Sequence, residues 1–271
     1  MTEPDDGMAG LYALMSSPRS TLDMTMYVLV DRDAEQRLAA DAARGVRVRV
    51  MLDRNREGAA NAAAFSFLAA HGVAVRWAPP GFEATHEKAF VVDDRTAAVL
   101  TLNLTSRYYP TTRDFAVVDS DPADVAAIEA VFVADFAGNA AAAPHGADLV
   151  WSPGAQQQLA ALAGDARRGV HVEVVMTASP QWAHAFAALA AAGVAIRTYP
   201  DTETALYIHA KTDVVDAAGP EAQVFIGSQN FTAASFDDNR ELGVIVTQPS
   251  VVAAVNAVVG HDFAGASPWQ P

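Results

Sequence analysis

One unit of sequence occurs twice in this chain, and the duplication restricts the possible folds more than any other feature. Residues 43–50, a helix end with glycine followed by an alternating strand, recur as residues 167–174 at an offset of 124. Residues 68–76, a second helix, glycine and short strand, recur as residues 189–197 at an offset of 121. Small insertions in the loops explain why the offset between the two copies is not constant. The chain is therefore predicted to contain two similar halves.

Each copy reads as strand, helix, strand, helix, strand, then three strands that carry polar residues, and a closing helix at 121–136 or 249–263. This alternation predicts α/β lobes in which helices cover a sheet. An Ala-, Gly- and Pro-rich segment, residues 137–147, lies between the copies, so we expect one lobe in 1–140 and the other in 141–271. A pseudo-twofold axis is expected to relate the lobes.

The most distinctive polar pattern is His-x-Lys followed by aspartate, which occurs once in each copy: His86, Lys88 and Asp93, then His209, Lys211 and Asp216. Strand periodicity places the histidine and lysine of each copy on one face and the aspartate on the other. A single copy of the pattern is typical of a surface pair, whereas two copies at equivalent positions favour catalysis. The aspartates are predicted to support the site by holding nearby backbone.

A later strand in each half ends in a hydroxyl and an amide two residues apart, namely Thr101 and Asn103, then Ser228 and Asn230. A carboxylate, Asp114 or Glu241, follows each asparagine by eleven positions. The equal spacing predicts one site built from two half-sites, each with histidine, lysine, asparagine and a carboxylate as catalytic residues, and with Thr101 and Ser228 in supporting roles.

These residue types are those required by a phosphodiester substrate. Lysine and asparagine can bind the non-bridging phosphate oxygens. One histidine can attack phosphorus while the other protonates the leaving oxygen and then activates water or an alcohol; the residues leave the order open. Asp114 and Glu241 are suited to accept the Nδ1–H of a histidine and so fix its tautomer. A lysine beside each histidine repels divalent cations, so we expect neither a metal nor a cofactor.

The constellation resembles the signature of the phospholipase D superfamily, in which a duplicated His-x-Lys-x-x-x-x-Asp precedes Gly-Ser-x-Asn and a downstream acid. Residues 226–232 and 239–241 match that signature closely, and the likeness spans nearly the whole chain. The resemblance implies two tandem phospholipase D-like α/β/α sandwich lobes with the active site at their interface. It also implies a covalent phosphohistidine intermediate, with His86 as the nucleophile and His209 as the acid and base.

The first half departs from this signature at the glycine. Leu100 precedes Thr101, whereas Gly227 precedes Ser228. Because glycine lets backbone approach a ligand closely, the two half-sites are expected to be unequal.

Several aromatic residues near the motifs are expected to line the mouth of the cleft and to suit a phospholipid headgroup or acyl chain: Trp77, Phe82, Tyr108, Tyr109, Tyr207 and Phe236. Packing beneath loops is an equally good interpretation of them. A net charge of −14 disfavours nucleic acid as a partner. We therefore expect phospholipase D-type hydrolysis or transphosphatidylation of a phospholipid, with water or an alcohol as acceptor, by a monomer.

Two alternatives remain at this stage. A nuclease could use a local basic patch of arginines: Arg44, Arg47, Arg49, Arg54 and Arg56. An inactive module that binds phosphate is the other, although the intact residues of both copies argue against it.

The compartment stays open. The chain has no cysteine, which excludes disulfides and thiolate metal sites, and no stretch is long and apolar enough to cross a bilayer. The acidic first seven residues do not resemble a signal peptide. A soluble protein is expected, either cytoplasmic or exported with its leader removed.

Overall fold

The computed structural model describes residues 1–140, 142–144, 148–165 and 171–270. The first half contains, in order, β1 (Thr2–Glu3), α1 (Ala9–Met15), β2 (Thr21–Met26), α2 (Arg32–Ala43), β3 (Arg47–Leu52), α3 (Gly58–Ala70), β4 (Ala74–Trp77), β5 (Lys88–Val92), β6 (Thr96–Leu100), the 3-10 helix η1 (Ser106–Tyr108), β7 (Thr112–Asp119) and α4 (Pro122–Phe136).

The second half contains, in order, β8 (Leu149–Ser152), α5 (Ala155–Asp165), β9 (Glu173–Thr177), the 3-10 helix η2 (Pro180–Trp182), α6 (Ala183–Ala191), β10 (Ala195–Tyr199), β11 (Tyr207–Ile208), β12 (Lys211–Val215), β13 (Gln223–Gly227), α7 (Ala233–Asp237), β14 (Glu241–Val246), α8 (Pro249–Gly265) and β15 (Ser267–Pro268). The predicted alternation and both closing helices are confirmed.

Equivalent glycines end the helices that the repeat predicts. Gly72 and Gly193 have φ angles of +81° and +91°, a conformation that glycine adopts without the penalty of a side chain. The next residue donates back to a leucine carbonyl in both copies, Val73 to Leu68 and Val194 to Leu189, at 3.1 Å. The same local sequence thus produces the same helix end twice.

The two halves build different sheets. In the first, the strand order is β1-β7-β6-β5-β2-β3-β4, and β11 of the second half pairs with β7. In the second, the strands separate into β12-β13-β14-β8 and β15-β10-β9. The break falls between β12 and β9, at the place that β2 occupies between β5 and β3 in the first half.

The second half has fewer residues than the first before its repeat glycine, and this difference explains the break in the sheet. Strand β8 pairs antiparallel with β14 as β1 pairs with β7, and a cis peptide bond follows each, at Glu3-Pro4 and Ser152-Pro153. The repeat glycine Gly45 follows Pro4 by 41 positions, whereas the equivalent glycine, Gly169, follows Pro153 by 16. The described residues between β8 and β9 hold one helix, α5, where the first half has α1, β2 and α2. Among the described residues, the second half therefore has no counterpart of the central strand β2, and its strands form two separate sheets.

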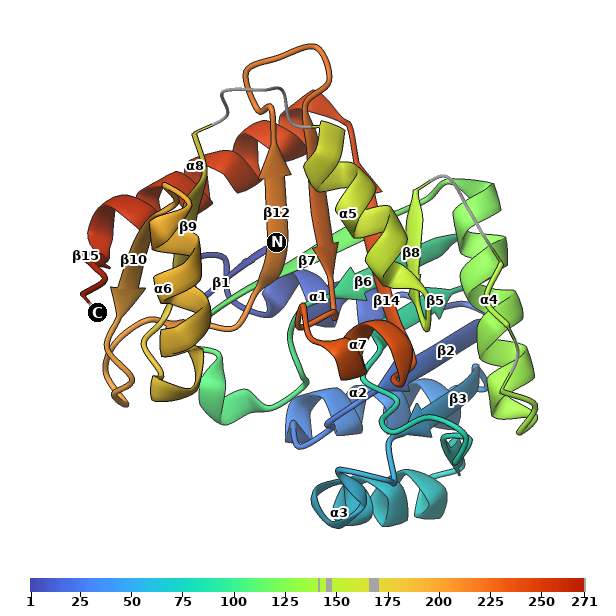
Figure 1. Ribbon diagram of the computed structural model, residues 1–271. Coiled ribbons are helices and arrows are strands. Elements are labelled where there is room, and N and C mark those ends of the chain that lie inside the picture. Colours follow the sequence, from blue (N-terminus) through green and yellow to red (C-terminus); the bar gives the residue numbers. More distant parts are fainter. Residues whose placement is uncertain (141, 145–147, 166–170, 271) are drawn as a thin grey trace.

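Helices cover the outer faces of the sheets, and the inner faces pack on each other (Figure 1). One core lies between β2, β3, β5 and β6 and the helices α1, α2 and α3. A second core joins β5 and β6 to α4, β8 and β14, so it belongs to both halves. Phe115 of β7 packs with β13 and α8 in a third. The two lobes thus share apolar interiors.

Reciprocal contacts connect the lobes across the pseudo-twofold axis. Arg113 pairs with Asp262 of α8 at 2.6 Å, and its counterpart Arg240 pairs with Asp135 of α4 at 2.8 Å. All four side chains are buried. Strand β11 pairs parallel with the start of β7, and Thr85 makes the equivalent parallel bridge with Arg240. In each half, the residues just before the motif lysine are therefore hydrogen-bonded to backbone of the other half.

The predicted boundary after residue 140 lies beside residues outside the described ones, and it remains a prediction. Residues 167–170 of the repeat, and His145, also lie outside them. Among the described residues, no helix has the length and apolarity needed to cross a membrane.

Candidate active site

His86 lies immediately before β5, where backbone of the second half fixes it. Its amide N–H donates to the carbonyl oxygen of Arg240 at 2.8 Å, and the Glu87 N–H donates to the same oxygen at 3.0 Å. The His86 ring packs edge-on against Tyr27 with 4.5 Å between centroids. The strand thus begins at Lys88 rather than at the histidine.

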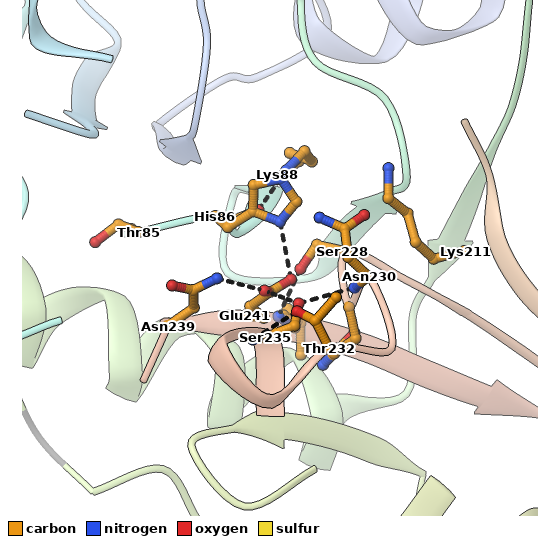
Figure 2. A network of polar contacts seen from close by, with 12 residues as sticks. Thr85, His86, Lys88, Lys211, Ser228, Asn230, Thr232, Ser235, Asn239 and Glu241 are labelled. Carbon is orange, nitrogen blue, oxygen red and sulfur yellow. Dashed lines mark hydrogen bonds and ion pairs between the residues drawn. The ribbon is translucent and has the colours of Figure 1, made fainter. Parts of the chain in front are cut away.

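The Nδ1 atom of His86 lies 2.9 Å from Oε2 of Glu241, at the start of β14 (Figure 2). The other oxygen of this buried carboxylate accepts from the Ser235 hydroxyl and, at 2.9 Å, from Asn239 Nδ2. Every oxygen of Glu241 therefore has a donor, and the histidine is held with Nε2 free for chemistry. Sequence reasoning missed Ser235 and Asn239, although Asn239 lies only two positions before Glu241 in the sequence.

His209 has the equivalent arrangement with Asp114 of β7. Its Nδ1 lies 2.9 Å from Oδ1 and 3.1 Å from Oδ2, and the Thr101 hydroxyl also donates to Oδ1. Each histidine therefore meets the carboxylate of the opposite half. The two half-sites are complete only when the lobes are together.

The lysines are buried beside the histidines. Burial and the charge of Lys88 lower the pKa of His86 to about 3. Burial also lowers the pKa of His209, with smaller contributions from Lys211 and Lys88. Lys211 affects His86 and Lys88 affects His209, so all four groups lie within electrostatic range. This concentration of positive charge suits a substrate that carries a negative charge.

The two lysines have different partners. Lys88 Nζ donates to the carbonyl oxygen of His86, and the Tyr27 ring lies 4.8 Å from Nζ. Lys211 Nζ instead lies 2.8 Å from Nε2 of His209. Burial lowers the pKa of Lys211 to about 8, against the opposing charges of Asp114 and Glu241.

The hydroxyls at the ends of β6 and β13 connect neighbouring strands. Thr101 Oγ1 accepts from Phe115 N–H at 2.9 Å, and Ser228 Oγ accepts from Leu242 N–H at 3.2 Å. Asn103 is half-buried, and its Oδ1 has no hydrogen-bond partner among the described residues. Asn230 is exposed and its N–H donates to Ser235 Oγ at 2.8 Å.

The motif aspartates occupy equivalent turns. Asp93 and Asp216 have φ angles of +53° and +48° after β5 and β12. The Asp93 carboxylate accepts from the N–H groups of Arg19, Ser20 and Thr21. Asp93 thus has the supporting backbone contacts that its position in the motif predicts.

The glycine before Ser228 has a packing role. A Cβ on Gly227 would lie 2.6 Å from the Phe225 ring and 2.7 Å from Gly243 Cα. In the first half the equivalent positions are Ala98, Leu100 and Ala116, so Leu100 supplies the bulk that Phe225 supplies in the second. Gly227 thus makes room for an aromatic ring, and close approach of a ligand to its backbone remains a prediction.

Three of the six predicted substrate-contacting aromatics line a cavity of about 670 Å³ next to His209, namely Tyr108, Tyr109 and Tyr207. The others pack elsewhere. Trp77 stacks on Phe65, the Phe82 ring lies 4.3 Å from the Arg240 guanidinium, and Phe236 joins the core beneath β8.

The arginines proposed as a basic patch are mostly neutralised. Arg44 pairs with Asp41, Arg47 and Arg49 with Asp23, and Arg56 with Glu83, while Arg54 lies over the Trp77 ring. That interpretation of the patch is not supported.

Among the described residues, one acidic cluster has metal-ligand geometry, formed by Asp23, Asp94 and Glu129. Arg49 donates to Asp23 at 2.5 Å and to Glu129 at 2.8 Å, so a cation of the protein itself already lies at this cluster. Neither histidine belongs to it.

Comparison with known proteins gives a consistent result. Residues 11–136 and 153–263 match the family model described as cardiolipin synthase, PLD-like domain. No curated protein matches the sequence. The fold is similar to polyphosphate kinase from Porphyromonas gingivalis, at 16% identity and a TM-score of 0.68 over 97% of this chain, which spans about half (49%) of that protein.

A second solved structure, phosphatidylserine synthase from Haemophilus influenzae Rd KW20, has 12% identity and a TM-score of 0.65. The match covers 96% of this chain and 84% of the synthase. At these identities the likeness shows the fold alone. The match to the family model identifies the two lobes as PLD-like.

Proposed function

We propose, from the premise that the chain belongs to the PLD-like domain family of cardiolipin synthase, that it is a metal-independent phosphodiesterase with a covalent phosphohistidine intermediate. The observation that carries the proposal is the crosswise pairing of His86 with Glu241 and of His209 with Asp114, both at 2.9 Å. Each pairing fixes Nδ1 and turns Nε2 toward the reaction, and Nε2 of His209 lies 2.8 Å from Nζ of Lys211, which can share a proton with it.

In the first step, Nε2 of neutral His86 attacks phosphorus. The P–N bond forms as the P–O bond to the leaving alcohol breaks, and His209 gives that alcohol oxygen a proton. Lys88, Lys211, Asn103 and Asn230 bind the non-bridging oxygens, whose negative charge they stabilise through the displacement. The lowered pKa of His86 keeps its imidazole unprotonated and nucleophilic at neutral pH.

In the second step, His209 removes a proton from water or from an acceptor alcohol. The oxygen of that acceptor attacks phosphorus, the P–N bond breaks, and His86 is released. Water gives hydrolysis and an alcohol gives transphosphatidylation. The assignment of attack to His86 follows the family resemblance.

For the substrate we favour a phospholipid. Support comes from the net charge of −14, from the carboxylate partners of the arginines, and from the three tyrosines of the cavity beside His209. Four of the five arginines of the predicted basic patch have a carboxylate partner, which weakens the attraction of that patch for a long polyanion.

Turnover of bis(p-nitrophenyl) phosphate in the presence of a chelator tests the catalytic assignment. His86→Ala and His209→Ala are each expected to lower kcat by at least about 10²-fold, since each removes a reacting group. His171→Ala is the matched control, because His171 is exposed and contacts Glu173 alone among the described side chains. Unchanged turnover in both active-site variants would contradict the assignment of the two histidines to catalysis.

Substrate class is tested by comparing headgroup release from short-chain phospholipids with cleavage of single-stranded DNA under the same conditions. Faster DNA cleavage would favour the nuclease alternative. Loss of all activity in chelator would contradict the metal-independent mechanism.

A further inference from the structure

The two motif lysines occupy equivalent positions in the repeat but have different surroundings. Lys88 Nζ donates to the carbonyl oxygen of His86 and lies over the Tyr27 ring, 4.8 Å from its centroid. Lys211 Nζ lies 2.8 Å from Nε2 of His209. Because the motif itself is the same in both halves, the cause of this difference must lie in the residues around each lysine.

The Tyr27 ring contacts both motif residues of the first half-site. It packs edge-on against the His86 ring, with 4.5 Å between centroids and an angle of 69° between planes. Burial lowers the pKa of Lys88 well below its ordinary value, so an aromatic face beside Nζ favours the charged ammonium. One side chain thus orients the imidazole and attracts the ammonium at the same time.

Tyr27 comes directly after β2, the strand that distinguishes the two halves. Among the described residues, the second half has no counterpart of β2, so it supplies no ring to His209 from this direction. The Tyr207 ring does lie beside His209, but at 6.4 Å between centroids and from β11, and Ala84 fills its position in the first half. The contact of one ring with both motif residues is therefore a property of the first half-site.

A buried network fixes the backbone of Tyr27 together with that of His86. Asn61 is fully buried, and its Nδ2 donates to the carbonyl oxygens of Tyr27 at 2.8 Å and of Asp53 at 2.9 Å. The Asp53 carboxylate accepts from the N–H of Thr85, the residue before His86, at 2.8 Å. The ring and the histidine are therefore held relative to each other.

The backbone contact before the histidine is common to both halves, whereas the ring is not. Thr177 occupies the position of Asp53, and its Oγ1 accepts from the Ile208 N–H at 2.8 Å, as Asp53 accepts from Thr85. Both histidine segments are thus attached to the end of a parallel strand. The Tyr27 ring remains as the difference in contacts that can direct the lysine.

The ring is not explained by packing of the core. Tyr27 is half-buried, and the apolar cores formed by the described residues do not include it. Burial raises the pKa of the Tyr27 hydroxyl, and the charge and hydrogen bond of Glu57 raise it further. The phenol is therefore neutral, and its ring rather than a charge acts on the site.

We propose that Tyr27 is a positioning residue: its ring holds Lys88 away from Nε2 of His86 and so leaves that nitrogen free to attack phosphorus. The inference rests on the proposed function, in which His86 is the nucleophile and His209 the proton donor. Attack uses the lone pair of Nε2, which an ammonium hydrogen-bonded to it would occupy. At His209 the same contact suits a nitrogen that must receive and pass on a proton.

Turnover of bis(p-nitrophenyl) phosphate by Tyr27→Leu and Tyr27→Phe tests the role of the ring. Tyr27→Leu removes the aromatic face and is expected to lower kcat by about tenfold, the effect of losing one contact between a ring and a buried cation. Its KM should stay within about twofold of wild type, because both lysines remain to bind phosphate. Tyr27→Phe keeps the face and is expected to recover kcat to within about threefold of wild type.

Phe186→Leu is the matched control for loss of an aromatic contact. Phe186 of α6 packs edge-on against Trp269, at 5.8 Å between centroids, and touches no residue of the site. This variant is expected to lower Tm without changing kcat. Equal kcat in Tyr27→Leu and Tyr27→Phe would overturn the proposal, as would a kcat loss in Phe186→Leu of the size seen in Tyr27→Leu.

Nitrogen NMR of the histidine side chains separates this proposal from the proposed function. In wild-type protein, Nε2 of His209 is expected to show the shift of a hydrogen-bonded nitrogen and Nε2 of His86 that of a free acceptor. In Tyr27→Leu, the His86 signal is expected to move toward that of His209. This movement without a loss of turnover would support the positioning role while contradicting His86 as nucleophile. A loss of turnover with an unmoved His86 signal would overturn the positioning role and leave the proposed function intact.

Discussion

Nζ of Lys211 lies 2.8 Å from Nε2 of His209, so the two groups can share one proton. Because Nδ1 of His209 faces Asp114, the contact places the lysine on the nitrogen that faces the reaction. Lys88 has no such contact with Nε2 of His86 and turns to the His86 carbonyl oxygen instead. This difference fits His209 as the proton donor.

The pH dependence of kcat/KM follows from this pair. Lys211 loses its proton as the pH rises through about 8, so activity is expected to fall above that value. His86, with a pKa near 3, stays unprotonated down to acid pH, so activity at pH 5 is expected to remain within about threefold of that at pH 7.

Rate measurements on an aryl phosphodiester between pH 4 and pH 10 would check this profile. Lys211→Arg serves as the comparison, because arginine keeps its charge and the alkaline decline should move upward. A decline between pH 7 and pH 6, as for an ordinary imidazole, would contradict the account.

The carboxylates that hold the histidines are expected to be essential for rate. Burial alone would raise the pKa of Glu241, but the hydrogen bond and charge of His86 keep this pKa below its ordinary value. Glu241→Gln presents an amide where His86 needs an acceptor, so kcat is expected to fall by about 10²-fold to 10⁴-fold. Asp114→Asn should have a similar effect through His209. A change of less than threefold in both would mean that the pairings do not orient the histidines.

The buried pair Arg240–Asp135 is expected to stabilise the contact between lobes. Arg240→Ala leaves Asp135 buried without this partner, which is expected to lower the free energy of unfolding by roughly 3–5 kcal/mol. Arg32→Ala is the control, since the Arg32 side chain is 58% exposed and its pair with Glu35 is expected to contribute less than about 1 kcal/mol.

Urea unfolding measures both variants. The double change Arg240→Met with Asp135→Leu should recover most of the loss, because apolar side chains of similar size can replace a buried ion pair. Equal losses in Arg240→Ala and Arg32→Ala would contradict the structural role.

The packing role of Gly227 gives a prediction about stability. Gly227→Ala places a methyl group against the Phe225 ring and the Gly243 backbone and is expected to destabilise by about 1–3 kcal/mol. Gly260→Ala, in α8 with nothing within 4 Å of its Cβ, is expected to be neutral or stabilising by up to about 1 kcal/mol.

Thermal unfolding distinguishes the two glycines. The double variant Phe225→Ala with Gly227→Leu copies the first half and should be more stable than Gly227→Leu alone. If Gly227→Ala unfolds at the wild-type temperature while activity is lost, the glycine would have the ligand-contact role that sequence reasoning assigned to it.

The half-sites could be predicted from the sequence because both copies of the repeat contain the same types of residue at the same spacing. Asn103 and Asp114 are separated like Asn230 and Glu241, so equal local folds follow. The partners across the interface could not be predicted in this way. Which histidine meets Glu241 depends on how the sheets pack, and strand periodicity carries no information about that.

The break in the sheet of the second half could not be predicted from the repeat either. The predicted order of strand, helix and strand occurs in both halves, but β8 corresponds to β1 rather than to β2. Their sequences share only the proline that follows each strand.

Trapping the intermediate tests the central claim most directly. His209→Ala should slow the second step, so rapid acid-free quenching with a labelled phosphodiester and peptide mass spectrometry should find one phosphoryl adduct, stable in alkali and labile in acid, on His86. The His86→Ala variant should carry none. An adduct on His209 of the wild-type protein would reverse the roles of the two histidines, and the absence of any adduct during turnover would contradict covalent catalysis.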